Sequence, residues 1–500
     1  MPATWFVTRV PSDRRIATWK VNAINRTRSL LQAIHPASSA PWDGAGCATA
    51  YSCVMPENAP NLPPGPRLPR LLQASRWLFA PFPFMQSCAD RYGDPFTVRM
   101  TGLPPMVFFT DPSAIRQIFT GDSQQFRAGQ ANRIFESILG PNSLLLLDGS
   151  RHRRERKLLM PPFHGARMRL YGEMMWAIAD RSIDAWPVGT AFPIHPRLKE
   201  VTLEIILRVV FGVDEGPRLA RLRGLVRDAL RILDGSNPLR NVWIWRRFAR
   251  LRSDIRKLLR EEVSRRRATL PNEGTDIMSL LVTARDEDGR PMTDEEIRDE
   301  MITLLVAGHE STAASLAWVI HRLLEHPDVL EAARAEVASV VGNGPDLGAP
   351  TADQVANLVY LDAVIKETAR LNPVVSVVVR QIKTDLRIGD TLLPGGCIAA
   401  PCIYLTHRRT DLWSEPEVFD PTRFLGGRAD PYVFFPFGGG IRHCVGAAFA
   451  TYEMKIVLAR ILSRIVLRRD VGRPVRVVRR GLLHCPSGNL RVIVRWPDAT

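Results

Sequence analysis

The segment FFPFGGGIRHCVG occupies residues 434–446 and holds a single cysteine, Cys444, in a glycine-rich loop. Glycines allow a tight backbone that can approach a bulky group and point its amides at a sulfur atom. Arg442 adds a positive charge two residues before the cysteine. A lone cysteine of this kind is either a small buried hydrophobe or a reactive or metal-binding thiolate. The loop alone leaves both interpretations open.

A long helix is predicted upstream of this loop. Thr293 followed by the acids of residues 294–296 has the pattern of a capping box, and the periodic pattern ends at Glu325. A helix of about 32 residues is about 48 Å long. Residues 301–320, MITLLVAGHESTAASLAWVI, are apolar nearly all round except for a polar patch in the middle. We expect this helix to be central and buried, with the polar patch kept there for a function.

Shorter elements surround this helix in the prediction. A second helix covers Val359–Leu371, and Pro95–Phe109 has the pattern of two short strands around a turn. Further short strands are expected near Val374–Arg380 and within Asp385–Pro401, where Gly389-Asp390 is a hairpin signal. The sequence therefore predicts a mainly α fold with small β-sheets.

The composition is that of a packed globular protein. Of the 500 residues, 45% are hydrophobic and 24% charged. The seven cysteines are sparse and odd in number, with no CxxC pair, which argues against a disulfide framework or a zinc ribbon and fits a reducing compartment. Residues 1–60 contain no apolar run that indicates a membrane span or a signal peptide. We expect a flexible extension over 1–60, with a targeting segment or an over-long start as alternatives, and one domain over 61–500.

A basic excess is the unusual feature of the composition. The net charge is +16, and residues 221–270 alone hold fifteen basic and five acidic side chains. Such a charge favours acidic partners. We exclude nucleic acid, because no zinc finger, RNP motif or glycine-rich phosphate loop accompanies the charge. Within the basic block, Trp243 to Arg252 alternates aromatic residues and arginines, which favours weak peripheral contact with anionic lipid; a solvated helix face is the alternative.

The cysteine loop also matches a longer pattern. Its spacing is FGGGxRxCxG, the heme-thiolate signature of the cytochrome P450 family. The matching residues are Phe437, Gly438, Gly440, Arg442, Cys444 and Gly446. Three more family motifs occur in order along the chain: AGHEST at 307–312, ExxR from Glu367 to Arg370, and PTRF at 421–424. From about residue 60 to 500, the chain thus resembles a cytochrome P450 of the soluble, bacterial type.

The resemblance implies the cytochrome P450 fold, with heme b held between the long central helix and the C-terminal cysteine loop. It makes Cys444 the axial ligand of the heme iron and places Phe437 beside the sulfur, where it tunes the iron. Further cofactor contacts are expected from Gly438, Arg442, Gly446, His152, Arg156 and Arg380, the cationic ones toward the heme propionates. A solvated basic helix is the alternative interpretation around His152. In the family, the residues that correspond to Glu367, Arg370 and Arg423 form a structural triad that fixes the cysteine loop.

The resemblance places oxygen activation on the central helix. Two protons must reach the distal oxygen along a positioned polar chain, and Glu310 with the next hydroxyl corresponds to the family's acid–alcohol pair. That hydroxyl is Ser311, where the family has threonine, and Thr312 follows it. Serine keeps the hydroxyl and loses the methyl group, so we expect oxygen activation to be retained. Gly308 is expected to allow a local bulge, and His309 is either a proton relay or a side chain on the helix flank.

The implied activity is that of a monooxygenase, which inserts one oxygen atom from O2 into a lipophilic small molecule. The alternative is a heme-thiolate protein without monooxygenation, such as a peroxide-dependent enzyme, an isomerase or a heme sensor. The resemblance places substrate contacts in five regions: 127–147, 201–245, 305–307, 374–379 and 483–487.

Electrons are expected to come from another protein, because the chain ends at Thr500, soon after the cysteine loop, without room for a fused reductase. The resemblance implies a ferredoxin or flavodoxin with its reductase, which passes on electrons from NAD(P)H. The expected docking residues for such an acidic donor are Arg151, Arg153, Arg154, Lys157, Lys455 and Arg460. We expect a monomer in the cytoplasm.

Overall fold

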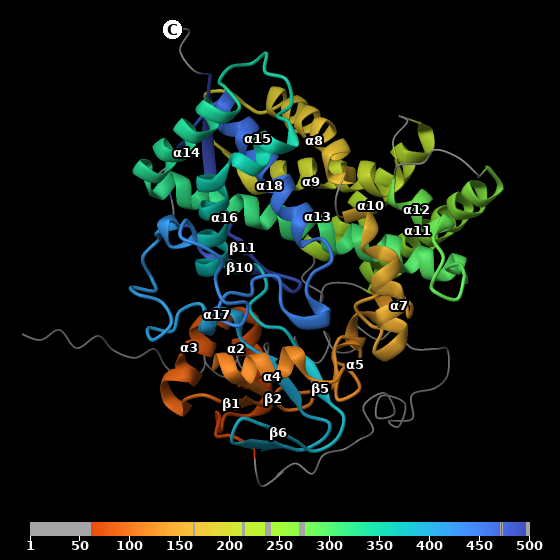
Figure 1. Cartoon of the computed structure of the whole chain (residues 1–500), viewed down its shortest axis with the longest axis vertical. Helices are drawn as coiled ribbons and strands as arrows, with labels where there is room; N and C mark the ends of the chain where they lie inside the picture. Colours follow the sequence, from red (N-terminus) through yellow and green to blue (C-terminus); the bar gives the residue numbers. More distant parts are fainter. Residues whose placement is uncertain are drawn as a thin grey trace, which may run out of the picture.

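The computed structural model describes residues 62–163, 166–212, 216–235, 242–269, 276–470, 472 and 474–496 (Figure 1). The extension expected over residues 1–60 lies outside these residues, so the domain boundary stays a prediction. The described chain is mainly α-helical with small sheets, as the sequence predicts.

The helices alternate with short connections along the chain. In order, the α-helices are α2 (Arg70–Phe79), α3 (Pro81–Tyr92), α4 (Pro112–Thr120), α5 (Ala128–Ala131), α6 (Glu136–Leu139), α7 (Gly149–Leu159), α8 (Ala166–Asp184), α9 (Ile194–Phe211), α10 (Pro217–Gly235), α11 (Val242–Thr269), α12 (Ile277–Thr283), α13 (Asp294–Glu325), α14 (Pro327–Val340), α15 (Ala352–Asn357), α16 (Val359–Leu371), α17 (Ile403–Thr406) and α18 (Ala447–Arg464). The 3-10 turns are η1 (Arg133–Phe135), η2 (Pro161–Phe163), η3 (Pro421–Phe424) and η4 (Gly440–Arg442). The helix predicted over Val359–Leu371 is confirmed as α16.

Helix α13 crosses the middle of the molecule and confirms the predicted central helix (Figure 1). It has 32 residues and begins with the predicted capping box, in which the Thr293 hydroxyl accepts from the Glu296 N–H and the Glu296 carboxylate accepts from the Thr293 N–H. The bulge predicted at Gly308 is wrong, because α13 continues as an α-helix through this residue. A Cβ at Gly308 would lie 3.0 Å from Ile206 Cδ1 of α9, so this glycine instead permits close packing of the two helices.

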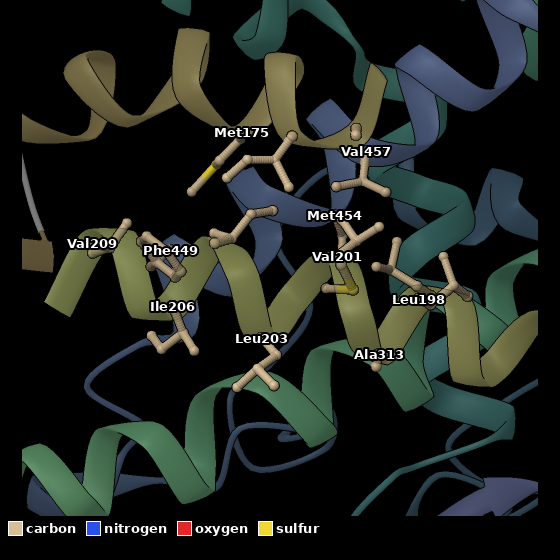
Figure 2. Packing of buried hydrophobic residues seen from close by; sticks show 14 of the residues in the cluster. Met175, Leu198, Val201, Leu203, Ile206, Val209, Ala313, Phe449, Met454 and Val457 are labelled. Carbon is tan, nitrogen blue, oxygen red and sulfur yellow. The ribbon is translucent and has the colours of Figure 1, made fainter. Parts of the chain in front are cut away.

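The main core lies where α8, α9, α13 and α18 pack together. Figure 2 shows Leu203 and Ile206 extending from α9 toward α13, while Met175 comes from α8. Phe449 and Met454 of α18 belong to the same cluster (Figure 2). Each such side chain contributes about 1.5–3 kcal/mol by burial. This core fixes the beginning of α18 and therefore the cysteine loop directly before it.

The strands form small sheets at the edge of the helical body. They are β1 (Phe96–Val98), β2 (Met106–Phe109), β3 (Phe126–Arg127), β4 (Phe192–Pro193), β5 (Arg380–Ile382), β6 (Leu386–Ile388), β7 (Thr391–Leu393), β8 (Ile398–Pro401), β9 (Val466–Arg469), β10 (Val477–Arg480), β11 (Leu483–Pro486) and β12 (Arg491–Arg495). The largest sheet has the order β1-β2-β8-β5-β3; β10 pairs with β11, β6 with β7, and β12 lies between β4 and β9. The antiparallel β1–β2 and β6–β7 pairs confirm the strands predicted within Pro95–Phe109 and around Gly389.

One strand prediction is wrong. The apolar run before Arg380 is not a strand, since β5 begins only at Arg380. Val377 and Val379 pack against one hydrophobic cluster and Val375 and Val378 against another. These β-branched side chains are half-buried without forming a ladder, and their packing against the two clusters explains the composition that suggested a strand.

Candidate functional site

The cysteine loop closes tightly over α4. The Cys444 N–H donates to the Phe437 carbonyl at 3.0 Å, and α18 begins three residues after the cysteine. Gly438 and Gly440 have φ values of +69° and +63°, which residues with a side chain rarely adopt. A Cβ at Gly440 would lie 2.0 Å from the Phe119 carbonyl oxygen. These glycines are therefore required by backbone shape and by the approach of α4.

Cys444 differs from the other cysteines in the described part of the chain. Its side chain is solvent-accessible, whereas the remaining ones are buried: Cys88, Cys397, Cys402 and Cys485. Desolvation by surrounding protein still raises the pKa of the Cys444 thiol, while the Gly446 backbone N–H and the charge of Arg156 lower it. The Cys444 sulfur can therefore be reached by a ligand.

Arg442 connects the cysteine loop to the chain before α7. Its Nη2 lies 2.5 Å from Asp148 Oδ1, and its Nη1 donates to the Leu144 carbonyl at 3.2 Å. Asp148 occupies the N-cap position of α7 without capping that helix; its carboxylate accepts instead from the Gly129 and Gln130 N–H groups. Nothing in the sequence distinguishes this role of Asp148, because an acid directly before a helix has the pattern of an ordinary N-cap.

Arg380 and His152 are buried within electrostatic range of Arg442. The Arg380 guanidinium donates to the Val379 and Gly439 carbonyls at 2.9 and 3.4 Å, and no carboxylate in the described residues lies within ion-pair distance of it. Burial, and then the charge of Arg442, lower the pKa of Arg380 to about 9. His152 Nδ1 has no hydrogen-bond partner in the same part of the structure, and burial with the neighbouring arginines lowers the pKa of His152 to about 3. Such groups suit an anion bound among them.

A buried ion-pair network joins α16 to the chain before the cysteine loop. Glu367 and Arg370 are paired on α16, and Arg423 Nε lies 3.5 Å from Glu367 Oε1. The Asp420 N–H donates to the same carboxylate oxygen at 3.0 Å. Arg370 also donates to three carbonyls, those of His407, Pro416 and Val418. The structure therefore brings together all three residues of the predicted triad.

The polar patch of α13 divides into an accessible and a buried side. Ala307 is exposed and Ser311, one turn later, is half-buried, whereas Thr312 is buried. The Ser311 hydroxyl donates to the Ala307 carbonyl at 2.6 Å, and the Thr312 hydroxyl donates to the Gly308 carbonyl at 2.9 Å. Of the two predicted hydroxyls, Ser311 is the one on the accessible side of the helix.

Glu310 has a partner on α9. Its Oε1 lies 3.1 Å from Lys199 Nζ, and both side chains are mostly buried. Nothing in the sequence signals this role of Lys199, because a lysine in a helix is usually a surface residue. His309 is buried, and its carbonyl accepts from the Thr202 hydroxyl at 2.8 Å. The structure thus pairs Glu310 with Lys199, and the acid–alcohol pair with Ser311 stays a prediction.

The geometry and the four motifs agree with a comparison against known families. Residues 60–489 match the family described as Cytochrome P450. The chain belongs to the cytochrome P450 family. This P450 is 40% identical over 443 residues to cytochrome P450 135B1 of Mycobacterium tuberculosis, covering 87% of this chain and 92% of the relative. It is 34% identical over 419 residues to cytochrome P450 135A1 of the same species, covering 81% and 89%.

Two solved structures share the fold of this P450. Retinoic acid-bound cyanobacterial CYP120A1 matches with a TM-score of 0.76 at 27% identity, covering 87% of this P450 and 99% of that chain. The heme domain of cytochrome P450DA matches with a TM-score of 0.75 at 23% identity, covering 87% and 98%. The predicted P450 fold is therefore confirmed.

Heme is the cofactor that the P450 family implies, and the residues of this P450 fit it. Cys444 offers an accessible sulfur, and a Cβ at Gly446 would meet no atom within 4 Å, so this part of the loop borders open space. Arg380 and His152 are buried groups that lack an acidic partner in the described chain. Two heme propionates carry the charge that such groups require.

Two of the expected docking residues are wrong. Lys455 is buried and donates to the Val355 carbonyl at 3.0 Å. Arg460 is fully buried, with Nη2 2.6 Å from Asp180 Oδ1. Both lie on sides of α18 that neighbouring helices cover, which the sequence of α18 does not reveal. The docking residues on α7 are more accessible: Arg151, Arg153 and Lys157 are exposed, and Arg154 is half-buried.

Proposed function

We propose that this P450 is a heme-thiolate monooxygenase. It inserts one atom of O2 into a lipophilic small molecule and reduces the other to water with two electrons and two protons. The observation that carries this proposal is the accessible Cys444 thiol, the only such cysteine among the described residues. Bound heme supplies oxygen activation, which a thiolate ligand favours by pushing electron density toward the iron. The buried Arg380 and the half-buried Arg442, with His152 and Arg156, are proposed to hold the propionates.

Proton delivery is proposed for the accessible side of α13. Ser311 is the hydroxyl placed there, next to the exposed Ala307. Glu310 is held in place by Lys199 and passes protons to the Ser311 hydroxyl after that hydroxyl has donated its own. Thr312 is buried and bonded to the Gly308 carbonyl, which leaves it a supporting role.

A lipophilic substrate is proposed from the apolar residues of the expected contact regions. Residues 374–379 are rich in valine, and most of the expected region 483–487 forms β11. Trp318 of α13 donates to the His484 carbonyl at 2.9 Å, so β11 lies directly on the central helix. CYP120A1, at 27% identity, binds retinoic acid, which is itself lipophilic. A screen of lipophilic compounds that follows the low-spin to high-spin shift of the ferric heme tests this class.

The electron donor is proposed to be an acidic ferredoxin or flavodoxin, reduced from NAD(P)H by its reductase. Exposed basic side chains on α7, together with a groove of about 380 Å³ beside the cysteine loop, support this surface. Residues from three elements line the groove: Ala352, Val355, Ala356, Phe437, Ala447, Ala448, Thr451, Tyr452 and Lys455. Charge complementarity of this kind accelerates association and weakens as salt rises.

Weak contact with anionic lipid is proposed for the described part of α11. The side chains from Trp243 to Arg246 lie outside the described residues. Beyond them, Arg247 and Arg250 are exposed while Phe248 and Leu251 are buried in the core. The contact is therefore electrostatic, and no described helix is long and apolar enough to cross a membrane. Flotation with acidic liposomes at low salt should carry the protein upward; an unbound protein would support the solvated helix face and a purely cytoplasmic enzyme.

The thiolate assignment is tested with the carbon monoxide complex of the reduced protein. We expect the Soret band of a thiolate-ligated heme, which Cys444→Ala abolishes and the matched variant of a buried cysteine, Cys88→Ala, retains. A Soret band typical of histidine ligation, or a protein that retains no heme, would refute the assignment. Product formation that requires peroxide and proceeds without O2 and a donor would favour the alternative class of heme-thiolate protein.

A further inference from the structure

The start of the loop over residues 140–147 is attached to α13 by Asp299, which none of the P450 motifs includes. Asp299 Oδ2 accepts from the backbone and side-chain N–H groups of Asn142 at 3.2 and 3.0 Å. Gly140 has a φ of +92°, and a Cβ there would lie 2.3 Å from Asp299 Cγ. Asp299 is in turn held by Arg298, whose Nη2 lies 2.8 Å from its Oδ1. The loop thus begins in close contact with a fixed carboxylate.

The middle of the same loop is attached to α13 by the next residue, Glu300, and by Thr303, about one turn after Asp299. Glu300 Oε1 accepts from the Leu144 N–H at 2.6 Å. The hydroxyls of Thr303 and Ser143 lie 2.7 Å apart, and both residues are buried. Three side chains within five residues of α13 therefore bond three consecutive residues of the loop.

Glu300 is suited to this contact as a neutral acid. Its Oε2 is buried without a partner in the described structure, and the same is true of Glu155 Oε2 on α7. Burial raises the pKa of Glu300 well above its usual value, and the charges of Glu155, Asp299 and Glu296 add to the shift. A neutral carboxyl group still accepts the Leu144 N–H, and it avoids placing a further charge among these acids.

The loop lies between the solvent and the edge of the heme site. On its inner side, the carbonyls of Leu144 and Leu147 accept from Arg442, a proposed propionate ligand. On its outer side, Pro141, Leu146 and Leu147 help to line a surface depression of about 470 Å³. Movement of this loop would therefore uncover the edge of the site at Arg442.

We propose that Asp299, Glu300 and Thr303 form a latch on α13 that holds loop 140–147 closed beside Arg442 and limits how fast small molecules reach the heme. The three are positioning residues, since they act through the loop and do not touch the heme site themselves. Closure of the loop follows from the contacts alone. The effect on how fast small molecules reach the heme also rests on the proposed function.

Hydrogen–deuterium exchange of the heme-loaded enzyme tests the closure. In Glu300→Ala, the amides of residues 140–147 should exchange about tenfold faster, because the Leu144 N–H loses its acceptor. Glu300→Gln should remain like the wild type, since the amide oxygen replaces the neutral acid. The exposed Glu295→Ala on the same helix is the matched control and should change nothing. Unaltered exchange in Glu300→Ala would show that Glu300 does not hold the loop closed. Fast exchange in Glu300→Gln would show that Glu300 does not act as a neutral acid.

A second variant and a second readout complete the test. Asn142→Ala removes the side-chain bonds of Asn142 to Asp299 and Arg151 from the loop side and leaves α13 unchanged. It should accelerate exchange in the same residues by a smaller factor; wild-type exchange would count against the latch. Imidazole binding to the ferric heme, followed by stopped flow, should be about tenfold faster in Glu300→Ala. Fast amide exchange of the loop with an unchanged rate of imidazole binding would show that the loop does not limit access to the heme. Failure of the thiolate assignment would appear in the carbon monoxide spectrum and leave the exchange result intact.

Discussion

Arg370 and Glu367 form a fully buried ion pair on one face of α16, with Arg370 Nε and Nη2 each 2.7 Å from a different carboxylate oxygen of Glu367. Arg370 also satisfies backbone carbonyls of the chain that leads toward the cysteine loop. The pair is therefore a structural joint between α16 and the loop that holds Cys444.

Replacing Arg370 with alanine should destabilise the folded protein strongly. The change leaves the Glu367 carboxylate buried without its partner, which costs about 3–5 kcal/mol. Lys366→Ala on the same helix removes a partly exposed pair with Asp362, 2.6 Å away, and should cost less than about 1 kcal/mol. Urea unfolding of the two variants provides the comparison. Equal losses would mean that the buried pair has no special role.

Replacing Arg380 with leucine should have opposite effects on the apoprotein and on heme binding. The apoprotein should become more stable, because a buried guanidinium without an ion-pair partner in the described chain is removed. Heme affinity should fall by about 10- to 100-fold, since a charge-assisted bond to a propionate is lost. Heme transfer to an acceptor globin measures the affinity, with the exposed Arg387→Leu as control. Undiminished affinity would exclude Arg380 as a propionate ligand.

Ser311 and Thr312 should differ in their effect on coupling. Ser311→Ala removes the accessible hydroxyl of α13 and should lower product formation by about 100-fold, with electrons diverted to hydrogen peroxide. Thr312→Val removes a hydroxyl that bonds only the Gly308 carbonyl and should change coupling by less than about twofold. Peroxide yield per electron pair is the measurement. Strong uncoupling in Thr312→Val alone would assign the role to Thr312.

His407 should make the protein sensitive to acid. Burial, followed by the charges of Arg408 and Arg370, lowers the pKa of His407 to about 3, and its Nε2 accepts from the Phe435 N–H at 3.1 Å. Between pH 6.5 and about 3, His407 is protonated in the unfolded chain and neutral in the folded protein. The free energy of unfolding therefore falls as pH decreases through this window. Above the window, the contribution of His407 to stability is fully present.

The histidine contribution is isolated by His407→Gln, whose amide oxygen can still accept from the Phe435 N–H. Within the window, the slope of its unfolding free energy against pH should be smaller than that of the wild type by about 1.4 kcal/mol per pH unit. Denaturant unfolding at several pH values measures the two slopes. Parallel slopes would show that another group is responsible for the acid sensitivity.

The family, the mainly α fold and the identity of the main site residues could be predicted from the sequence alone. The FGGGxRxCxG spacing, the capping box at Thr293 and the periodicity of α13 are local patterns, and local patterns survive in a sequence because neighbouring residues enforce them. For the same reason Glu367 and Arg370, three residues apart on one helix, could be paired without a structure.

Which faces are covered and which distant groups meet became known from the three-dimensional packing. It buried Lys455 and Arg460, turned Ser311 rather than Thr312 to the accessible side, and joined Glu310 to Lys199 across two helices. Asp148 and Glu300 acquired their roles from loops that are close in space and far apart in sequence. Such contacts depend on how helices pack, and a single sequence carries the composition of a packed face but not the identity of its neighbour.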